Sequence, residues 1–208
     1  MARRICVFDL ETRLLSTDLS PDKEKGWAEI RRGKGGISAL VIYDSLEGWV
    51  FNYDDCDILE IASHLESADT VIGFNSKFFD IPVVEGVLGR MLKIAEHIDL
   101  SDLIQKSLMG LNIPRRKGEN TLDAVCKRTL GRGKIDHGSN IKTLIADGKW
   151  GNIFRYCADD VRLTKDLYRH VRDEGGVISV NETLLPIALP PHLLGQAHPS
   201  PSASQESR

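Results

Sequence analysis

Residues 4–12 read RICVFDLET. Apolar, β-branched and aromatic side chains dominate residues 4–10, which predicts a short buried β-strand there. Two acids, Asp9 and Glu11, stand near its end. Because residues two apart on a strand point to the same face, we expect both carboxylates to project from one side of it. Like charges this close repel each other, and a divalent cation would relieve the repulsion. The alternative is that both acids lie at the solvated end of the strand.

Beyond this strand, the chain alternates between buried-strand patterns and helical periodicity. Further strands are predicted at residues 37–43, 48–53 and 70–74. The turn sequence DSLEG joins the first two of these as a hairpin. Helical spacing of apolar side chains marks residues 57–67, 78–91, 121–130 and 152–172. Residues 97–104 indicate a strand that runs into a helix. This order predicts an α/β protein with a mixed sheet flanked by helices.

The length and composition suit one medium-sized domain. We expect a folded domain over residues 1–180 and an extended, flexible tail over residues 181–208, because the chain beyond Pro190 is rich in Pro, Ser, Gln and His. The formal net charge of -3 argues against a protein that coats nucleic acid through bulk positive charge.

The cysteines and the N-terminus bear on the compartment. The four cysteines are scattered without metal-binding spacing and predict free thiols in a reducing compartment: Cys6, Cys56, Cys126 and Cys157. The first residues lack the apolar stretch of a signal peptide, and no segment is long enough to span a membrane. These observations predict a cytoplasmic protein with no membrane association.

A second motif, GFNSKFFD at residues 73–80, carries another acid. A predicted strand ends here in a polar turn, and Asp80 follows at the start of a helix. Ligands of open α/β sheets gather at the carboxyl ends of strands, so Asp80 lies where a site is expected. The alternative is that Asp80 only complements the dipole of its helix.

A third motif, YCADD at residues 156–160, lies within a long predicted helix. Tyr156 and Asp160 are four residues apart and therefore share one helical face. Asp159 is expected to point elsewhere, toward solvent. The alternative for Tyr156 is a half-buried core aromatic with its hydroxyl at the surface.

The strings FDLET, NSKFFD and YCADD, taken together and in this order, resemble the DEDD superfamily of 3′–5′ exonucleases in its tyrosine variant. The histidine variant would need histidine at position 155, where this chain has Arg155. The resemblance runs from about Arg3 to about Gly175. More loosely, residues 26–44 and 67–80 are similar to ribonuclease H-like domains predicted to be exonucleases and sometimes linked to helicases.

The resemblance implies a ribonuclease H-like mixed sheet, with three antiparallel strands followed by parallel strands, as in polymerase proofreading domains. It also implies two Mg²⁺ or Mn²⁺ ions. Asp9 would bridge them, Glu11 and Asp160 would complete the site of the ion that activates water, and Asp80 would hold the other. Tyr156 would orient the attacking water. Carboxylates are the hard oxygen ligands that these ions prefer.

The nucleic acid is expected to meet basic and aromatic side chains. Residues 115–134 hold seven basic side chains against two acidic ones, and they begin with Arg115, Arg116 and Lys117, which suit phosphate contacts. Phe78 or Trp27 would stack on a base near the 3′ end, beside Asn75. The alternatives are a solvated loop for the basic run and ordinary packing for the aromatic residues.

The sequence thus predicts a metal-dependent 3′–5′ exonuclease that acts on the 3′ ends of single-stranded nucleic acid, with DNA favoured over RNA and a role in DNA repair. A polymerase or helicase encoded separately is an expected partner. Two alternatives stay open: a structure-specific or endo-acting nuclease of the same fold, and a non-catalytic nucleic-acid-binding module.

Overall fold

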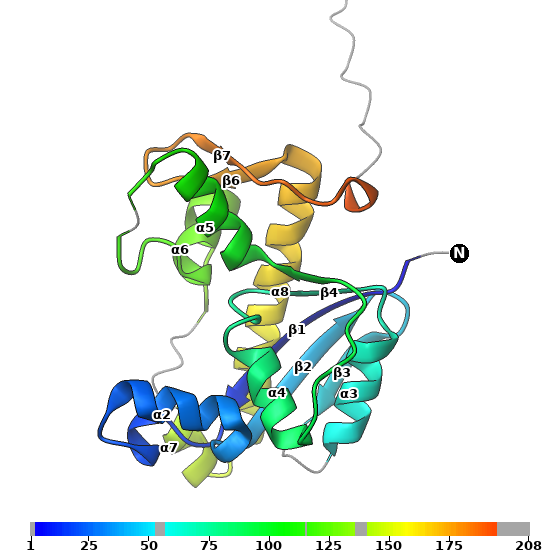
Figure 1. The fold of residues 1–208 in the computed structure, drawn as a ribbon, viewed down its shortest axis with the longest axis vertical. Coiled ribbons are helices and arrows are strands. Elements are labelled where there is room, and N and C mark those ends of the chain that lie inside the picture. Colours follow the sequence, from blue (N-terminus) through cyan, green and yellow to red (C-terminus); the bar gives the residue numbers. More distant parts are fainter. Residues whose placement is uncertain (1–2, 53–56, 115, 136–140, 195–208) are drawn as a thin grey trace, which may run out of the picture.

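The computed structural model describes residues 3–52, 57–114, 116–135 and 141–194 of the chain (Figure 1). Within these ranges no helix is both long and apolar enough to cross a membrane.

A five-stranded mixed sheet forms the centre of the molecule. Its strands are β1 (Ile5–Thr12), β2 (Ile37–Asp44), β3 (Gly48–Asn52), β4 (Thr70–Gly73) and β5 (His97–Asp99). They lie in the order β3-β2-β1-β4-β5. The β1–β2 and β2–β3 pairs are antiparallel, while the β1–β4 and β4–β5 pairs are parallel. This confirms the predicted mixed sheet and its hairpin, and it fits a ribonuclease H-like fold.

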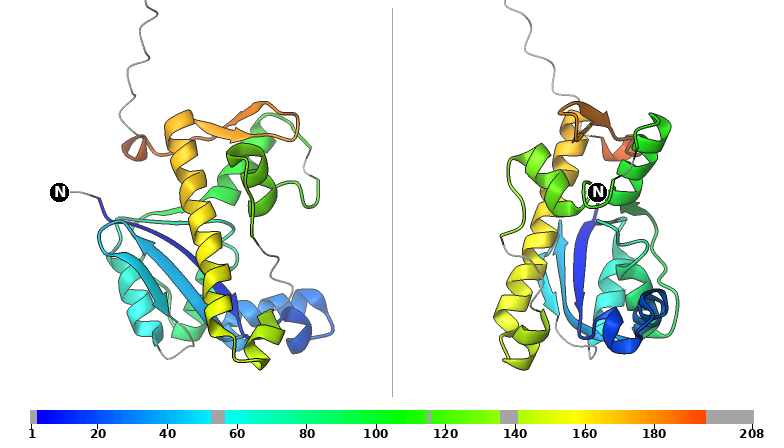
Figure 2. Two further views of the ribbon diagram at one scale, coloured as in Figure 1. Left: turned by 180° about the vertical axis from the view of Figure 1, so that it is seen from behind. Right: turned by 90° about the vertical axis from the view of Figure 1, so that its left-hand side faces the viewer.

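Helices cover both faces of the sheet. They are α1 (Ser16–Leu19), α2 (Lys23–Glu29), the π-helix η1 (Ile30–Lys34), α3 (Ile58–Ser67), α4 (Asp80–Leu88), α5 (Leu100–Gly110), α6 (Leu122–Leu130), α7 (Ile141–Ala146), α8 (Trp150–Glu174) and the 3₁₀ helix η3 (Pro191–Leu193). Figure 2 shows the long helix α8 on one side of the sheet and α3 and α4 on the other.

The central strand β1 contributes side chains to both hydrophobic cores, because its side chains alternate between the two faces of the sheet. Cys6, Phe8 and Leu10 are buried in the core beneath α3 and α4. Val7 points the other way, into the core beneath α8. Asp9 and Glu11 continue the Val7 face, so the alternation directs their carboxylates toward α8.

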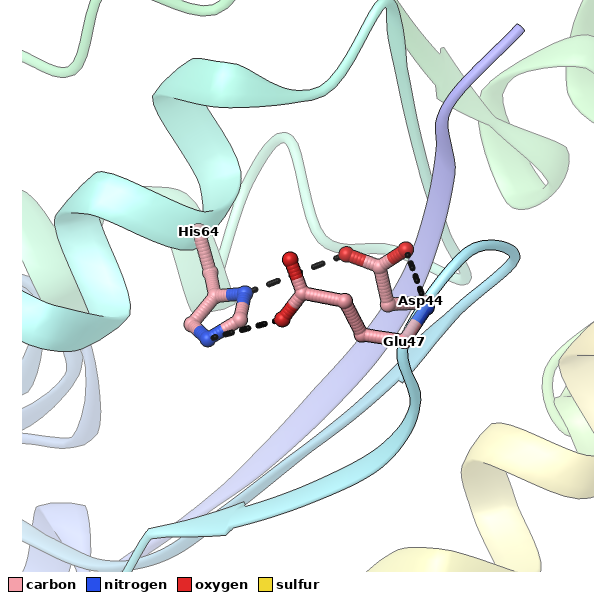
Figure 3. A group of neighbouring side chains, drawn as sticks. All are labelled: Asp44, Glu47 and His64. Carbon is pink, nitrogen blue, oxygen red and sulfur yellow. Dashed lines mark hydrogen bonds and ion pairs between the residues drawn. The ribbon is translucent and has the colours of Figure 1, made fainter. Parts of the chain in front are cut away.

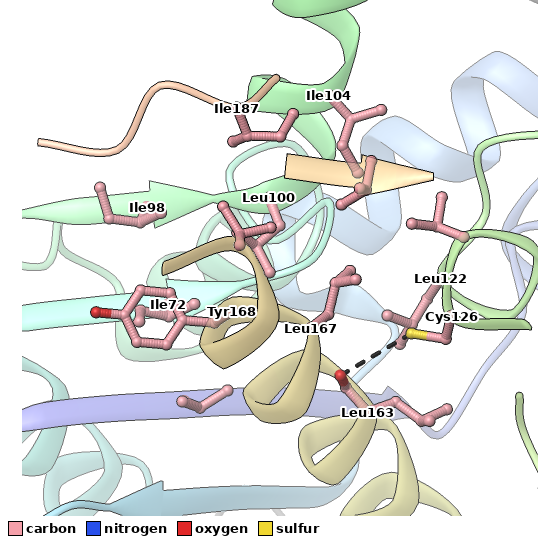
Figure 4. Close-up of a cluster of buried hydrophobic side chains, with 14 of the residues drawn as sticks. Ile72, Ile98, Leu100, Ile104, Leu122, Cys126, Leu163, Leu167, Tyr168 and Ile187 are labelled. Carbon is pink, nitrogen blue, oxygen red and sulfur yellow. Dashed lines mark hydrogen bonds between the residues drawn. The ribbon is translucent and has the colours of Figure 1, made fainter. Parts of the chain in front are cut away.

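The larger core continues beyond the sheet, around the C-terminal half of α8. Figure 4 shows its side chains converging from α5, α6 and α8, with the Cys126 thiol 3.9 Å from the Leu163 carbonyl oxygen. Strands β6 (Gly176–Ile178) and β7 (Leu184–Pro186) form a separate antiparallel pair against it. Leu185, Ile187 and Leu193 are buried there. Packed structure therefore continues past residue 180, where we expected a tail to begin; residues 195–208 lie outside the described residues.

The polar stretch between β1 and β2 contains three short helices that periodicity did not reveal. Each is too short to show a clear apolar stripe, and local contacts fix them instead. The Asp22 side chain caps α2 by accepting hydrogen bonds from the backbone N–H groups of Glu24 and Lys25. Gly33, at φ +80°, lets the backbone of η1 touch the backbone of α4 at Gly86. This contact ties η1 to the helix that begins with Asp80.

Candidate metal centre

Three carboxylates meet on the α8 face of the sheet. Asp9 and Glu11 come from the end of β1, and Asp160 comes from the middle of α8. One carboxylate oxygen of each lies within 4.8 Å of the others. Asp160 is buried, whereas Asp9 and Glu11 are half-buried. The shared face predicted for Asp9 and Glu11 therefore brings both acids against α8.

Asp80 approaches these three carboxylates from the β4 side of β1. It is the first residue of α4, which follows β4, and the parallel pairing of β1 with β4 places the carboxyl ends of both strands at one edge. Its side chain is buried, and its Oδ1 accepts the backbone N–H of Leu10 at 3.2 Å. A single hydrogen bond thus fixes Asp80 directly behind the strand segment that carries Asp9 and Glu11.

Helix α8 carries Tyr156 and Asp160 one turn apart, as their spacing predicts. The Tyr156 ring packs against a small apolar cluster with Ala39 and Ile153. Between them in the sequence, the buried thiol of Cys157 donates to the Asp9 carbonyl oxygen at 3.1 Å. Burial, followed by the charge of Asp9, raises the pKa of Cys157 well above its usual value, so it remains a neutral donor that seats α8 on β1.

The carboxylates disfavour one another's charge. Burial raises the pKa of Asp9 well above its usual value, and Asp160, Asp80 and Glu11 raise it further. Burial, with Asp160 next, raises the pKa of Glu11 to about 8. Burial likewise raises the pKa of Asp80 to about 7. The ionised form of each carboxyl group is therefore disfavoured here, and a bound cation would favour it.

Lys134 is a residue of this centre that the sequence analysis missed. Its Nζ lies 2.5 Å from Asp160 Oδ2 and 3.2 Å from the Tyr156 hydroxyl, to which it donates. Burial lowers the pKa of this ammonium, but the charge and hydrogen bond of Asp160, with Tyr156 and Asp9, together outweigh burial and raise the pKa overall. The sequence places Lys134 in the basic run of residues 115–134, because no local pattern separates it from its neighbours. It is the third residue after the helix stop Gly131.

Asp159 corrects a second expectation, because it does not point to solvent. Its side chain is buried, accepts the backbone N–H of Ile135 at 3.2 Å, and lies 3.5 Å from the guanidinium of Arg162. The segment that carries Lys134 runs along this side of α8. The adjacent acids of α8 therefore contact different parts of this segment: Asp159 accepts from the backbone of Ile135, and Asp160 pairs with the side chain of Lys134.

The donor set suits a divalent cation. Asp160 Oδ1 is buried and has no hydrogen-bond partner among the described residues, although Oδ2 of the same carboxylate is paired with Lys134. Leaving a buried carboxylate oxygen without a hydrogen-bond partner costs free energy, unless a bound ion interacts with that oxygen. Hard oxygen ligands without sulfur or imidazole suit Mg²⁺ or Mn²⁺.

Two pockets open beside the carboxylates and share Asn75. One, of about 320 Å³, is lined by Asp9, Asp160, Lys134 and polar side chains of α5 and the start of α6. The other, of about 440 Å³, is lined by Glu24, Trp27, Arg31, Asn75, Phe78 and Phe79. Asn75 has a left-handed backbone at φ 64°, which turns the chain between the two pockets.

The residues expected to bind nucleic acid differ in where they lie. Phe78 is 55% exposed, whereas Trp27 packs edge-on against Phe79 with ring centroids 5.6 Å apart. Arg116 forms an ion pair with Glu119 at 3.7 Å. Arg116 and Lys117 line neither pocket, and Arg115 lies outside the described residues.

A second group of metal-ligand residues lies at the far end of the hairpin. Asp44, Glu47 and His64 point toward one another in Figure 3. The guanidinium of Arg4 lies 2.7 Å from Asp44 and 2.6 Å from Glu47, and so supplies the positive charge of this group. Although burial raises it, the pKa of Asp44 is held below its usual value by the N–H of Leu46 and by Arg4.

Comparison with known proteins supports the fold. No protein-family model and no curated protein matches the sequence. Among solved structures, the chain is similar to the family B DNA polymerase from the hyperthermophilic archaeon Pyrobaculum calidifontis, with a TM-score of 0.61 and 19% sequence identity. The similarity covers 82% of this chain and 25% of that chain, so this chain corresponds to about a quarter of the polymerase. At this level of identity the similarity shows a shared fold.

Proposed function

We propose that this protein is a metal-dependent 3′–5′ exonuclease that hydrolyses the terminal phosphodiester bond of single-stranded nucleic acid, with DNA favoured over RNA. One observation carries the proposal: Asp9, Glu11 and Asp160 place carboxylate oxygens within 4.8 Å of one another at a pocket, with Asp80 behind them. The sequence resemblance to DEDD exonucleases supports the reaction. The fold shared with a DNA polymerase supports a nucleic acid substrate.

The four carboxylates would hold the metal ions. Asp9 and Asp160 line the pocket itself, Glu11 stands next to Asp9 on β1, and Asp80 reaches β1 from α4. Two Mg²⁺ or Mn²⁺ ions, when bound, would supply an activated water and stabilise the charge that develops on the leaving oxygen. The protein's own contribution is to hold these acids on three rigid elements, β1, α4 and α8.

Tyr156 and Lys134 would act on the reacting groups from the α8 side. The Tyr156 hydroxyl is a hydrogen-bond partner for the attacking water, and burial, with Asp160 next, raises the pKa of Tyr156, so it orients water rather than removing a proton. Lys134 holds its ammonium group at Tyr156 and Asp160. From there the ammonium faces the same pocket as the scissile phosphate and would offset its charge.

The two pockets joined at Asn75 suit an unpaired strand. In this proposal the terminal nucleotide occupies the pocket that contains Asp9, and a neighbouring base meets the exposed ring of Phe78. Phosphates farther along would meet the basic run that begins at Arg115, Arg116 and Lys117. A polymerase or helicase on a separate chain would supply the strand end.

The test is a nuclease assay on single-stranded DNA and RNA labelled at either end, with and without Mn²⁺, using Asp9→Ala as the control. We expect stepwise loss from the 3′ end that requires metal and disappears in Asp9→Ala. Tyr156→Phe should retain weak activity, because it loses one orienting hydroxyl and no ligand.

Each alternative has its own result in this assay. Internal cuts on both labelled strands would favour an endo-acting or structure-specific nuclease of the same fold. Binding of the strand without cleavage, together with no Mn²⁺ binding by calorimetry, would favour a non-catalytic module. Activity of wild-type strength in Asp9→Ala would contradict the assignment of the centre.

A further inference from the structure

We propose that Asp159 is a positioning residue of this centre, and that it acts by holding the backbone segment that presents Lys134. The inference rests on the proposed function in one respect: Lys134 must belong to the reacting site. It assigns a role to the second acid of the YCADD motif, which the metal ligands do not explain.

Two carboxylates from different helices hold successive peptide groups of this segment. The N–H of Lys134 donates to Oδ1 of Asp123, on α6, at 2.8 Å. The N–H of Ile135 donates to Oδ2 of Asp159, on α8, at 3.2 Å. Gly133 allows the first approach, because a Cβ there would lie 2.2 Å from Asp123 Oδ1. The backbone on both sides of the Lys134 side chain is thus fixed.

Side-chain packing does not hold the segment in place. Ile135 is 80% exposed, so its apolar side chain contributes no anchor to the core. The Lys134 side chain runs inward, with 19% of its surface exposed, to reach Asp160 and Tyr156. Ordering a long side chain costs rotamer entropy, and fixing its backbone lowers the remaining cost. The two carboxylate–backbone hydrogen bonds hold the backbone at Lys134 itself and so direct its side chain into the centre, while the ion pair of Arg132 with Asp166 ties the segment to α8 two residues earlier.

The position of Asp159 is not explained by Arg162. That guanidinium is 3.5 Å away on an arginine whose side chain is 48% exposed, whereas the Asp159 side chain is 9% exposed. Exposed ion pairs of this kind contribute little. A buried acid next to Asp160 adds repulsion to an already crowded centre. Its hydrogen bond to Ile135 brings an ammonium group to Asp160, which offsets that repulsion.

The test measures Mn²⁺ affinity by calorimetry on the full chain, and so does not require cleavage. Lys134→Met should bind Mn²⁺ about tenfold more tightly, because it removes an ammonium that competes for Asp160. Asp159→Ala and Asp159→Asn both remove one charge, but only asparagine keeps an oxygen for the Ile135 N–H. We expect Asp159→Ala to bind about threefold more tightly than Asp159→Asn, the size of coupling typical within one network.

The double variants decide whether the effect passes through Lys134. With Lys134→Met in place, Asp159→Ala and Asp159→Asn should have the same Mn²⁺ affinity. If they still differ, or if they match when Lys134 is present, the positioning role is wrong. Asp173→Ala is the matched control: it lies on the same helix, is paired with Arg172 at the surface, and should behave as wild type.

A second pair of variants removes the donor instead of the acceptor. Ile135→Pro has no N–H for Asp159, whereas Ile135→Ala keeps it, and the side chain at this position is exposed in either case. Ile135→Pro should shift Mn²⁺ affinity in the same direction as Asp159→Ala. Equal Mn²⁺ affinities for the two Ile135 variants would overturn the proposal. This comparison holds even if Asp159→Ala does not fold.

A wild-type protein that binds Mn²⁺ without cleaving would refute the proposed function and leave these comparisons valid. If cleavage is found, Asp159→Ala should lower kcat, leave KM unchanged, and be rescued by asparagine.

Discussion

Two groups of acidic side chains lie at opposite ends of the β1–β2 ladder, and both meet the geometric requirement for a metal site. The first is the centre of Asp9, Glu11 and Asp160; the second joins Asp44, Glu47 and His64. They differ in charge balance. Arg4 forms ion pairs with two acids of the second group, whereas in the first the ammonium of Lys134 pairs with one acid, Asp160.

The pKa values of the carboxyl groups differ in line with this charge balance. The pKa of Asp44 lies below its usual value, because hydrogen bonds from Leu46 and Arg4 outweigh its burial. Burial and neighbouring acids raise the pKa of Asp9 and of Glu11 instead. Proximity of acids therefore does not define a metal centre. What defines it is the charge that the protein leaves unbalanced, which a metal ion can then satisfy.

The largest effect expected is a contrast between the same substitution in the two groups. Glu11→Gln should lower cleavage by at least about a thousandfold, because several kcal/mol of metal-ion stabilisation is lost and each 1.4 kcal/mol is a factor of ten. Glu47→Gln should change cleavage less than about twofold, because its side chain is 53% exposed and far from the pocket. Rates on a 3′-labelled strand in Mn²⁺ measure both. Equal losses in the two variants would break the comparison.

Removing Arg4 should produce the next largest effect, this time on folding. Arg4→Met leaves a fully buried Asp44 carboxylate without its cation. Breaking a buried pair typically costs about 3–5 kcal/mol, and we expect about 2–3 kcal/mol here because backbone N–H groups still donate to Asp44. Urea unfolding measures it. The control is Arg90→Met, which breaks an exposed pair with Glu66 and should have a small effect. If the two losses were alike, Arg4 would not be the balancing charge.

Metal binding should stabilise the protein through the first group alone. At a Mn²⁺ concentration about a hundred times its Kd, the expected gain is about 2.7 kcal/mol, seen as a rise in Tm. Asp9→Asn should abolish this rise, whereas His64→Gln should preserve it. A rise that survives Asp9→Asn but is lost in His64→Gln would place the ion in the second group.

Whether the sequence could predict a feature of these two groups depends on how far apart along the chain the interacting residues lie. Local periodicity predicts that Asp9 and Glu11 share one face and that Tyr156 and Asp160 share another. That the two pairs meet is implied by the family resemblance, and the structure brings Asp9, Glu11 and Asp160 together. The inward turn of Lys134 depends on hydrogen bonds from α6 and α8 to a segment with no periodic pattern.

The second group could not be recognised for a related reason. Arg4 precedes β1, Asp44 ends β2 and His64 lies on α3, so strand pairing and the packing of α3 bring them together. The short helices between β1 and β2 were missed because caps and close backbone contacts, rather than an apolar stripe, define them. Sequence patterns indicate the candidate ligands, but charge balance is a tertiary property.

The smallest effect expected is a difference in pH dependence, measured in EDTA. Because the folded pKa of Glu11 is about 8 against an ordinary value of 4.5, its favourable contribution is complete below pH 4.5 and is lost as pH rises toward 8. Asp44, with a lowered pKa, contributes in the opposite sense and loses its contribution as pH falls below about its usual value of 3.8. The Tm advantage of Glu11→Gln over wild type should therefore widen from pH 5 to pH 8.

The widening should be modest, because Lys134 offsets part of the repulsion and interacting acids release their protons one after another over a wide range of pH. Glu47→Gln should run parallel to wild type over the same range. Excess Mn²⁺ should reverse the order, because the wild-type protein then gains the binding energy that Glu11→Gln has lost. A Tm gap that stayed constant with pH in EDTA would mean that Glu11 is already balanced by the protein, and the contrast between the two groups would then rest on Asp9 and Asp160 alone.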